Sequence, residues 1–137
     1  MKFTPYLYFS GQCEAAMAFY AECGLGGMSE VLRYASAPMG GPGPEWSDRI
    51  LHCLFSGDAV RFYASDAPDA EPMKGVALLI EPDSVGAGAA LFERMSAGGR
   101  VTVPFAPQFW GDHYGNFTDR FGVQWAMNCR DSSTTRE

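Results

Sequence analysis

The sequence predicts an α+β fold made of two successive modules, each with the element order β-α-β-β-β. One observation is that a strand-like apolar run followed by a helical stripe occurs twice, and a shift of 72 residues places Phe19-Tyr20 on Leu91-Phe92. Another is that both stripes stop at a glycine pair, 26–27 and 98–99. The 137 residues, 47% of them hydrophobic, suffice for one core. We therefore expect a single domain over 1–130, with modules at about 1–66 and 73–130, and a polar tail at 131–137.

In the first module, residues 3–9 form an apolar, aromatic run typical of a strand. Between 12 and 24, Ala16, Phe19, Tyr20 and Cys23 fall on one helical stripe. Strands are predicted at 28–35, 49–55 and 59–64, the last two joined by a turn at 56–58. The Pro/Gly segment 36–45 is an insertion in this copy, and we expect the region 36–48, with its apolar Met39 and Trp46, to reach a partner or to overhang a cavity.

The second module repeats this order. A strand is predicted at 76–80, a helix with a stripe of Val85, Ala89, Phe92 and Met95 follows, and strands come next at 101–109 and around "VQWAMNC". The helices of the two modules correspond at a shift of 72 residues, whereas the turn at 57–58 corresponds to the turn before Val123 at a shift nearer 63. The shift becomes smaller because the second copy lacks the insertion.

Composition excludes several classes of function. The formal charge is −6 and no Lys/Arg cluster interrupts it, which excludes a nucleic-acid partner. A membrane span is also excluded, because no run of 18 apolar residues occurs. The four cysteines lack C-x-x-C spacing, as expected of reduced thiols in a cytoplasmic chain. Cys13, beside Glu14, is the one candidate for a reactive thiol; the other three are expected in the core.

Two segments resemble a known family. "PYLYFSGQCEAAMAFYAECGLG" is similar to the opening of the PhnB-like proteins, a branch of the glyoxalase/bleomycin-resistance (vicinal oxygen chelate) superfamily. "WGDHYGNFTDRFGVQW" resembles that family's second signature, although Arg120 stands where proline is usual and Val123 where histidine is frequent. The resemblance covers residues 3 to about 129. It implies paired modules whose curved mixed sheets form a cavity, and a homodimer.

The resemblance also implies where a metal would be held. Enzymes of the superfamily take His, Glu or Gln ligands from four strand positions, which align here with Pro5, Arg61 or Phe62, Val76, and Trp125 or Ala126. None of these is a suitable ligand, so we expect no metal. Some PhnB-like proteins carry the name demethylubiquinone methyltransferase, but the chain lacks the glycine-rich turn that a nucleotide-type cofactor needs, and we expect no cofactor.

The aromatic segment 110–125 admits two interpretations. Residues 116–125 fit a hairpin in which Asp119 and Gly122 form the turn and Trp125 is core or cavity wall. Residues 110–115 either pack structurally or form a ligand mouth between two glycines. On the strand 49–55, alternation places His52 on the face shared with Arg61 and Tyr63, which is either solvated or binds an anion.

The hypothesis is therefore a small-molecule binding protein with an aromatic-lined cavity. The expected ligand-binding residues are Trp110, Asp112, His113, Tyr114, Trp125, His52 and Arg61. The alternative is a lyase- or isomerase-type enzyme that uses His52 or His113 as acid or base.

Overall fold

The computed structural model describes residues 1–38 and 41–130 and divides into two compact units, Met1–Glu71 and Pro72–Glu137. The first unit contains β1 (Tyr6–Phe9), α1 (Cys13–Glu22), β2 (Gly27–Arg33), the 3₁₀ turns Tyr34–Ser36 and Pro44–Trp46, β3 (Ile50–Ser56) and β4 (Arg61–Asp66). The second contains β5 (Leu78–Ile80), α2 (Val85–Ser96), β6 (Arg100–Pro107), β7 (Asp112–Thr118) and β8 (Gln124–Arg130). The predicted β-α-β-β-β order is confirmed in both.

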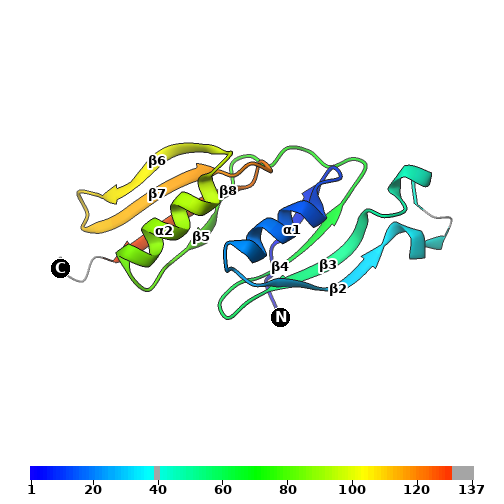
Figure 1. Ribbon diagram of the computed structural model, residues 1–137, viewed down its shortest axis with the longest axis horizontal. Coiled ribbons are helices and arrows are strands. Elements are labelled where there is room, and N and C mark those ends of the chain that lie inside the picture. Colours follow the sequence, from blue (N-terminus) through cyan, green and yellow to red (C-terminus); the bar gives the residue numbers. More distant parts are fainter. Residues whose placement is uncertain (39–40, 131–137) are drawn as a thin grey trace. The chain divides into compact units, whose positions relative to one another are not determined.

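Each unit is a four-stranded mixed sheet with one helix across one face (Figure 1). The strand orders are β1-β4-β3-β2 and β5-β8-β7-β6, so the two sheets repeat one topology. In both, the first strand pairs parallel with the last and the remaining pairs are antiparallel. The α+β class with curved mixed sheets is thus confirmed.

Equivalent glycines mark the repeat. A Cβ built on Gly26 would lie 2.2 Å from the backbone oxygen of Ser56, and one on Gly99 would lie 2.2 Å from that of Thr118. Each of these glycines directly precedes the strand that follows the helix, and its backbone lies close to the last residue of the antiparallel neighbouring strand. No side chain fits there, which explains why both helical stripes end in glycine pairs.

Aromatic rings on the helix side form the core of each unit. Tyr20 of α1 meets Phe55 and Phe62 edge-on, at ring distances of 6.1 and 6.3 Å. In the second unit Phe92 of α2 meets Phe117 of β7 at 5.0 Å. Since successive strand residues point to opposite faces, these contacts identify which side chains face away from each helix.

A single buried carboxylate ties the first unit together. Asp66, 1% exposed, accepts hydrogen bonds through Oδ1 from the backbone N–H groups of Gly11 (2.8 Å) and Cys13 (3.0 Å), and through Oδ2 from Ile50 (3.0 Å). It therefore joins the ends of β4 and β3 to the start of α1, where the N-cap residue Gln12 supplies no side-chain bond.

Two expectations need correction. The sequence predicted no strand over 110–115, but only Trp110 and Gly111 are in the turn, and from Asp112 onward the chain forms β7, paired on both sides. Cys13 is not an accessible thiol, because it lies at 0% exposure between α1 and the sheet. Cys13 is the first residue of α1, and its side chain points toward the core. The polar neighbour Glu14 did not indicate this orientation in the sequence.

Part of the insertion is described. Trp46 is half-buried, with its ring 5.4 Å from that of Tyr34 and the Arg49 guanidinium 4.1 Å above it. The expectation that 36–48 reaches a partner or overhangs a cavity stays a prediction. Met39 and the tail 131–137 lie outside the described residues.

Candidate ligand-binding site

The first unit carries a linked group of polar rings on the sheet face away from α1. We define the tyrosine–histidine cluster as Tyr6, Tyr8, His52, Arg61 and Tyr63. The hydroxyl of Tyr6 lies 2.9 Å from Nδ1 of His52, and the His52 ring lies 5.1 Å from that of Tyr63. Arg61 donates to the Tyr63 hydroxyl at 3.0 Å, and Tyr6 stacks on Tyr8 at 4.9 Å. The predicted meeting of His52, Arg61 and Tyr63 on one face is thus present.

The Tyr6 phenol stays protonated at neutral pH. Burial raises the pKa of Tyr6 above its ordinary value of 10.0, against an opposing effect of its hydrogen bond with Ser65. The phenol and Nδ1 of His52 therefore share one hydrogen bond, whose donor depends on the tautomer of the imidazole. The cluster can thus present an imidazole and a guanidinium to a ligand.

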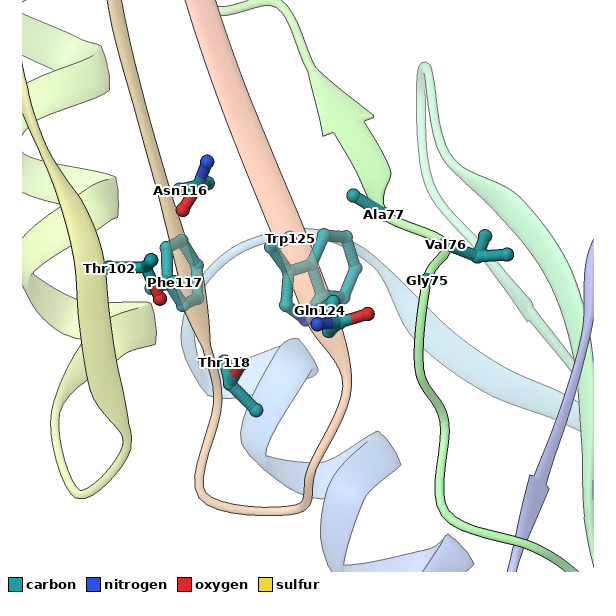
Figure 2. Close-up of a pocket in the computed structure, with 9 residues that line it drawn as sticks. All are labelled: Gly75, Val76, Ala77, Thr102, Asn116, Phe117, Thr118, Gln124 and Trp125. Carbon is teal, nitrogen blue, oxygen red and sulfur yellow. The ribbon is translucent and has the colours of Figure 1, made fainter.

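The second unit contains a pocket with a cavity volume of about 350 Å³. Figure 2 shows its residues across the sheet, from Thr102 on β6, through β7 and β8, to the segment 75–77 that leads into β5. The lining residues are Gly75, Val76, Ala77, Thr102, Asn116, Phe117, Thr118, Gln124 and Trp125. This volume lies at the small end of ligand pockets in proteins.

The residues that line this pocket come from both faces of the sheet. Asn116 and Thr118 flank Phe117, so their side chains point away from α2, and Gln124 pairs with Thr118 on the same face. These three residues and Thr102 carry hydrogen-bonding side chains without formal charge, and we call these four the rim of the pocket. Phe117 and Trp125 are each 2% exposed and pair with one another on the α2 side, where Phe117 meets Phe92.

Asp119 holds the indole ring of Trp125 in place. Its Oδ2 accepts from the Trp125 indole Nε1 at 2.8 Å, while Oδ1 accepts from the backbone N–H groups of Phe121 (2.8 Å) and Val123 (3.0 Å). One carboxylate thus forms the β7–β8 turn and fixes the tryptophan ring. The interpretation of Asp119 as a turn former is confirmed.

The residues of "WGDHYG" are divided between two faces. Asp112, 3% exposed, accepts from Asn128 at 3.0 Å, and the Tyr114 hydroxyl accepts from Asn116 at 3.1 Å, both on the face away from α2. His113 points to the helix side, with its ring 5.5 Å from that of Phe105. Asp112 and His113 therefore do not form one catalytic pair.

Trp110 is 42% exposed and contacts Phe109 and Tyr114 edge-on, at ring distances of 5.0 and 6.0 Å. Of the predicted ligand residues, this pocket includes Trp125. Sequence reasoning missed Thr102, Asn116, Thr118 and Gln124. The period-2 alternation of "NFTDRFGVQW" contained their signal, since the residues between the core aromatics must face outward.

The four positions aligned with superfamily metal ligands provide no metal centre in this structure. Val76 is 71% exposed, Phe62 and Trp125 are buried, and Arg61 donates to Tyr63. Within residues 1–38 and 41–130, no three His, Cys, Asp or Glu side chains come together in a way that could hold a metal ion. Neither helix in those ranges is long and apolar enough to cross a membrane.

Known proteins match nearly the whole chain. The family described as 3-demethylubiquinone-9 3-methyltransferase matches residues 1–128. Protein YjdN of Escherichia coli (strain K12) is 24% identical over 147 residues, covering 99% of this chain and 100% of that protein.

The crystal structure of protein PA1353 from Pseudomonas aeruginosa is 33% identical with a TM-score of 0.83, covering 95% of this chain and 98% of that one. A putative 3-demethylubiquinone-9 3-methyltransferase, PhnB protein, from Bacillus cereus has 20% identity and a TM-score of 0.78, covering 94% and 99%. Neighbours at 19% and 17% identity, described as glyoxalase or bleomycin-resistance proteins, share the fold. The chain belongs to the 3-demethylubiquinone-9 3-methyltransferase family, and it has the fold of the glyoxalase/bleomycin-resistance proteins.

Proposed function

We propose that this chain is a small-molecule binding protein whose ligand occupies the pocket of the second unit. The observation that carries the proposal is a cavity of about 350 Å³ with a rim of neutral hydrogen-bonding side chains, on strands that also contribute the buried aromatic residues Phe117 and Trp125 to its lining. Apolar walls with a few placed polar groups are the usual composition of a ligand site.

The rim also indicates the charge of the ligand. Among the described residues of the chain, those that line this pocket include no Asp, Glu, Lys, Arg or His. An ion would lose hydration on entry without gaining an opposite charge. We therefore expect an uncharged molecule with an apolar body and hydrogen-bonding groups at its edge.

A thermal-shift screen with uncharged metabolites and neutral aromatic compounds, followed by calorimetry on the hits, tests this proposal. Gln124→Ala removes one rim amide, and loss of one hydrogen bond, roughly 0.5–1.5 kcal/mol, should weaken binding about 2- to 10-fold. Gln12→Ala removes the same group from an exposed position on the first unit and should leave affinity unchanged. Equal affinities of Gln124→Ala and the unmodified protein, for every hit, would reject this pocket as the site.

A second candidate function is acid–base catalysis at the tyrosine–histidine cluster. The observation that favours it is the 2.9 Å contact between the Tyr6 hydroxyl and His52 Nδ1, with Arg61 nearby to stabilise an enolate-like anion. Once a substrate is found, His52→Ala should abolish turnover under this alternative. His113→Ala should not, because His113 faces α2. Full activity in both variants would dispose of the alternative.

We also propose that the two units act as one domain in a cytoplasmic homodimer. Each sheet has edge strands, and Leu79 on the edge strand β5 is 55% exposed, so a second surface could cover it. Four free, buried cysteines suit a reducing compartment. A single cooperative unfolding transition and a dimer mass by light scattering are expected; a monomer at micromolar concentration would contradict the dimer.

A further inference from the structure

Two cysteines from distant parts of the sequence meet in the core of the first unit. Sγ of Cys13, the first residue of α1, lies 4.0 Å from Sγ of Cys53 in the middle of β3. Both residues are 0% exposed, and both thiols are free. The pair therefore bridges the helix and the sheet that it covers.

We propose that Cys13 and Cys53 form an oxidisable dithiol, a modification site at which a peroxide converts the pair to a disulfide. The sulfurs need to approach by about 2 Å to reach the disulfide bond length of roughly 2.05 Å. Rotation of the two side chains, with a small movement of the start of α1, provides an approach of this size.

The balance of the reaction is simple. The thiolate of Cys53 attacks one oxygen of hydrogen peroxide, which breaks the O–O bond and leaves a sulfenic acid on Cys53 and one water. Sγ of Cys13 then attacks Sγ of Cys53 and displaces the second water. Two thiols are each oxidised by one electron, and one peroxide is reduced by two.

The contact assigns different roles to the two sulfurs. Their shared hydrogen bond, together with burial, raises the pKa of Cys13, and the same hydrogen bond lowers the pKa of Cys53. This hydrogen bond favours the thiolate on Cys53, so in the proposed reaction Cys53 attacks the peroxide and Cys13 is the resolving thiol.

Access for the peroxide comes from the start of α1. Gln12 gives the helix no side-chain cap, and the first turn is held by the bonds that Asp66 accepts from Gly11 and Cys13. Helix ends open locally at much lower free energy than the whole domain. Opening of this turn exposes the sulfur pair while the sheet stays folded.

The test is limited oxidation of the full-length reduced protein with hydrogen peroxide, under native conditions and again in urea, followed by digestion without reductant and mass spectrometry. In the native protein we expect the Cys13–Cys53 linked peptide as the main product, formed roughly tenfold faster than oxidation of Cys23 or Cys129, because thiolate fraction controls the rate. In urea the shorter loop favours Cys13–Cys23 instead.

Variants supply matched controls. Cys53→Ser should stop disulfide formation at Cys13, and Cys23→Ser, which alters another buried thiol of the same unit, should leave the native rate unchanged. If the native protein gives the product distribution seen in urea, or if all four thiols oxidise at equal rates, the proposal is wrong. The comparison of native and unfolded protein needs no variant and decides the matter even if Cys53→Ser fails to fold.

Discussion

Removal of the Asp66 carboxylate should destabilise the first unit more than any other single loss of charge described above. Asp66→Ala leaves the N–H groups of Gly11, Cys13 and Ile50 without their acceptor. Gly11 is exposed and water can replace its partner, but Cys13 and Ile50 are each 0% exposed. An unsatisfied buried donor costs roughly 1–3 kcal/mol, so two of them cost about 2–6 kcal/mol, a large part of a typical domain stability.

Asp66→Asn should cost about half as much, because one oxygen remains to accept and the new amide meets a backbone donor. Urea denaturation followed by circular dichroism gives the free energy of unfolding for both variants. Asp69→Asn removes an equivalent charge three residues away on the exposed surface and should change stability by less than about 0.5 kcal/mol. A loss below about 1 kcal/mol for Asp66→Ala, at an unchanged m-value, would refute the assignment of this carboxylate as the tie between sheet and helix.

Four further outcomes are expected. Asp119→Asn should destabilise by roughly 1–3 kcal/mol and shift the fluorescence of Trp125, because the turn and the indole lose a shared charged acceptor; unchanged emission and stability would contradict this. Burial raises the pKa of Tyr6 and Tyr34 above 10.0, so the stability that these phenols contribute is complete below pH 10 and is lost as the pH rises through their folded-state pKa. Phenolate absorbance measured against pH in native and in urea-unfolded protein tests this shift, and identical titration curves would count against it. Protein purified without a metal column should hold substoichiometric Zn, Ni, Mn and Fe and keep its melting temperature in EDTA, and one ion per chain lost together with stability would show the reasoning to be wrong. His52→Ala should leave the affinity for ligands of the second-unit pocket unchanged, since His52 is not among the described residues that line it, and calorimetry checks this.

Element order and strand faces could be predicted because both depend on local periodicity. Alternation along 49–55 put Cys53 and Phe55 on one face and His52 on the other, and the hairpin register then brought His52 near Tyr63. The paired glycines at 26–27 and 98–99 marked the ends of both helices, and Gly26 and Gly99 stand where no side chain fits.

The features that the sequence did not predict depend on contacts between helices and strands. The meeting of Cys13 with Cys53 follows from how α1 lies across its sheet, which no spacing in the sequence specifies. Asp66 lies beyond the strand predicted at 59–64, and no sequence pattern indicates that it accepts bonds from three backbone N–H groups of two separate segments. The rim of the pocket was not predicted, because it consists of polar residues that alternate with the aromatic residues on which the predicted cavity was based.

The most direct test of ligand binding in the second unit uses the three tryptophans as reporters. In a ¹⁵N-labelled sample, the indole N–H signals of Trp46, Trp110 and Trp125 can each be assigned by substitution with phenylalanine. On titration with a thermal-shift hit, we expect the Trp125 indole and the side-chain amides of Asn116 and Gln124 to shift together and saturate with one dissociation constant, while Trp46 of the first unit stays in place. A hit that binds but shifts Trp46 and leaves Trp125, Asn116 and Gln124 unmoved would contradict the central claim.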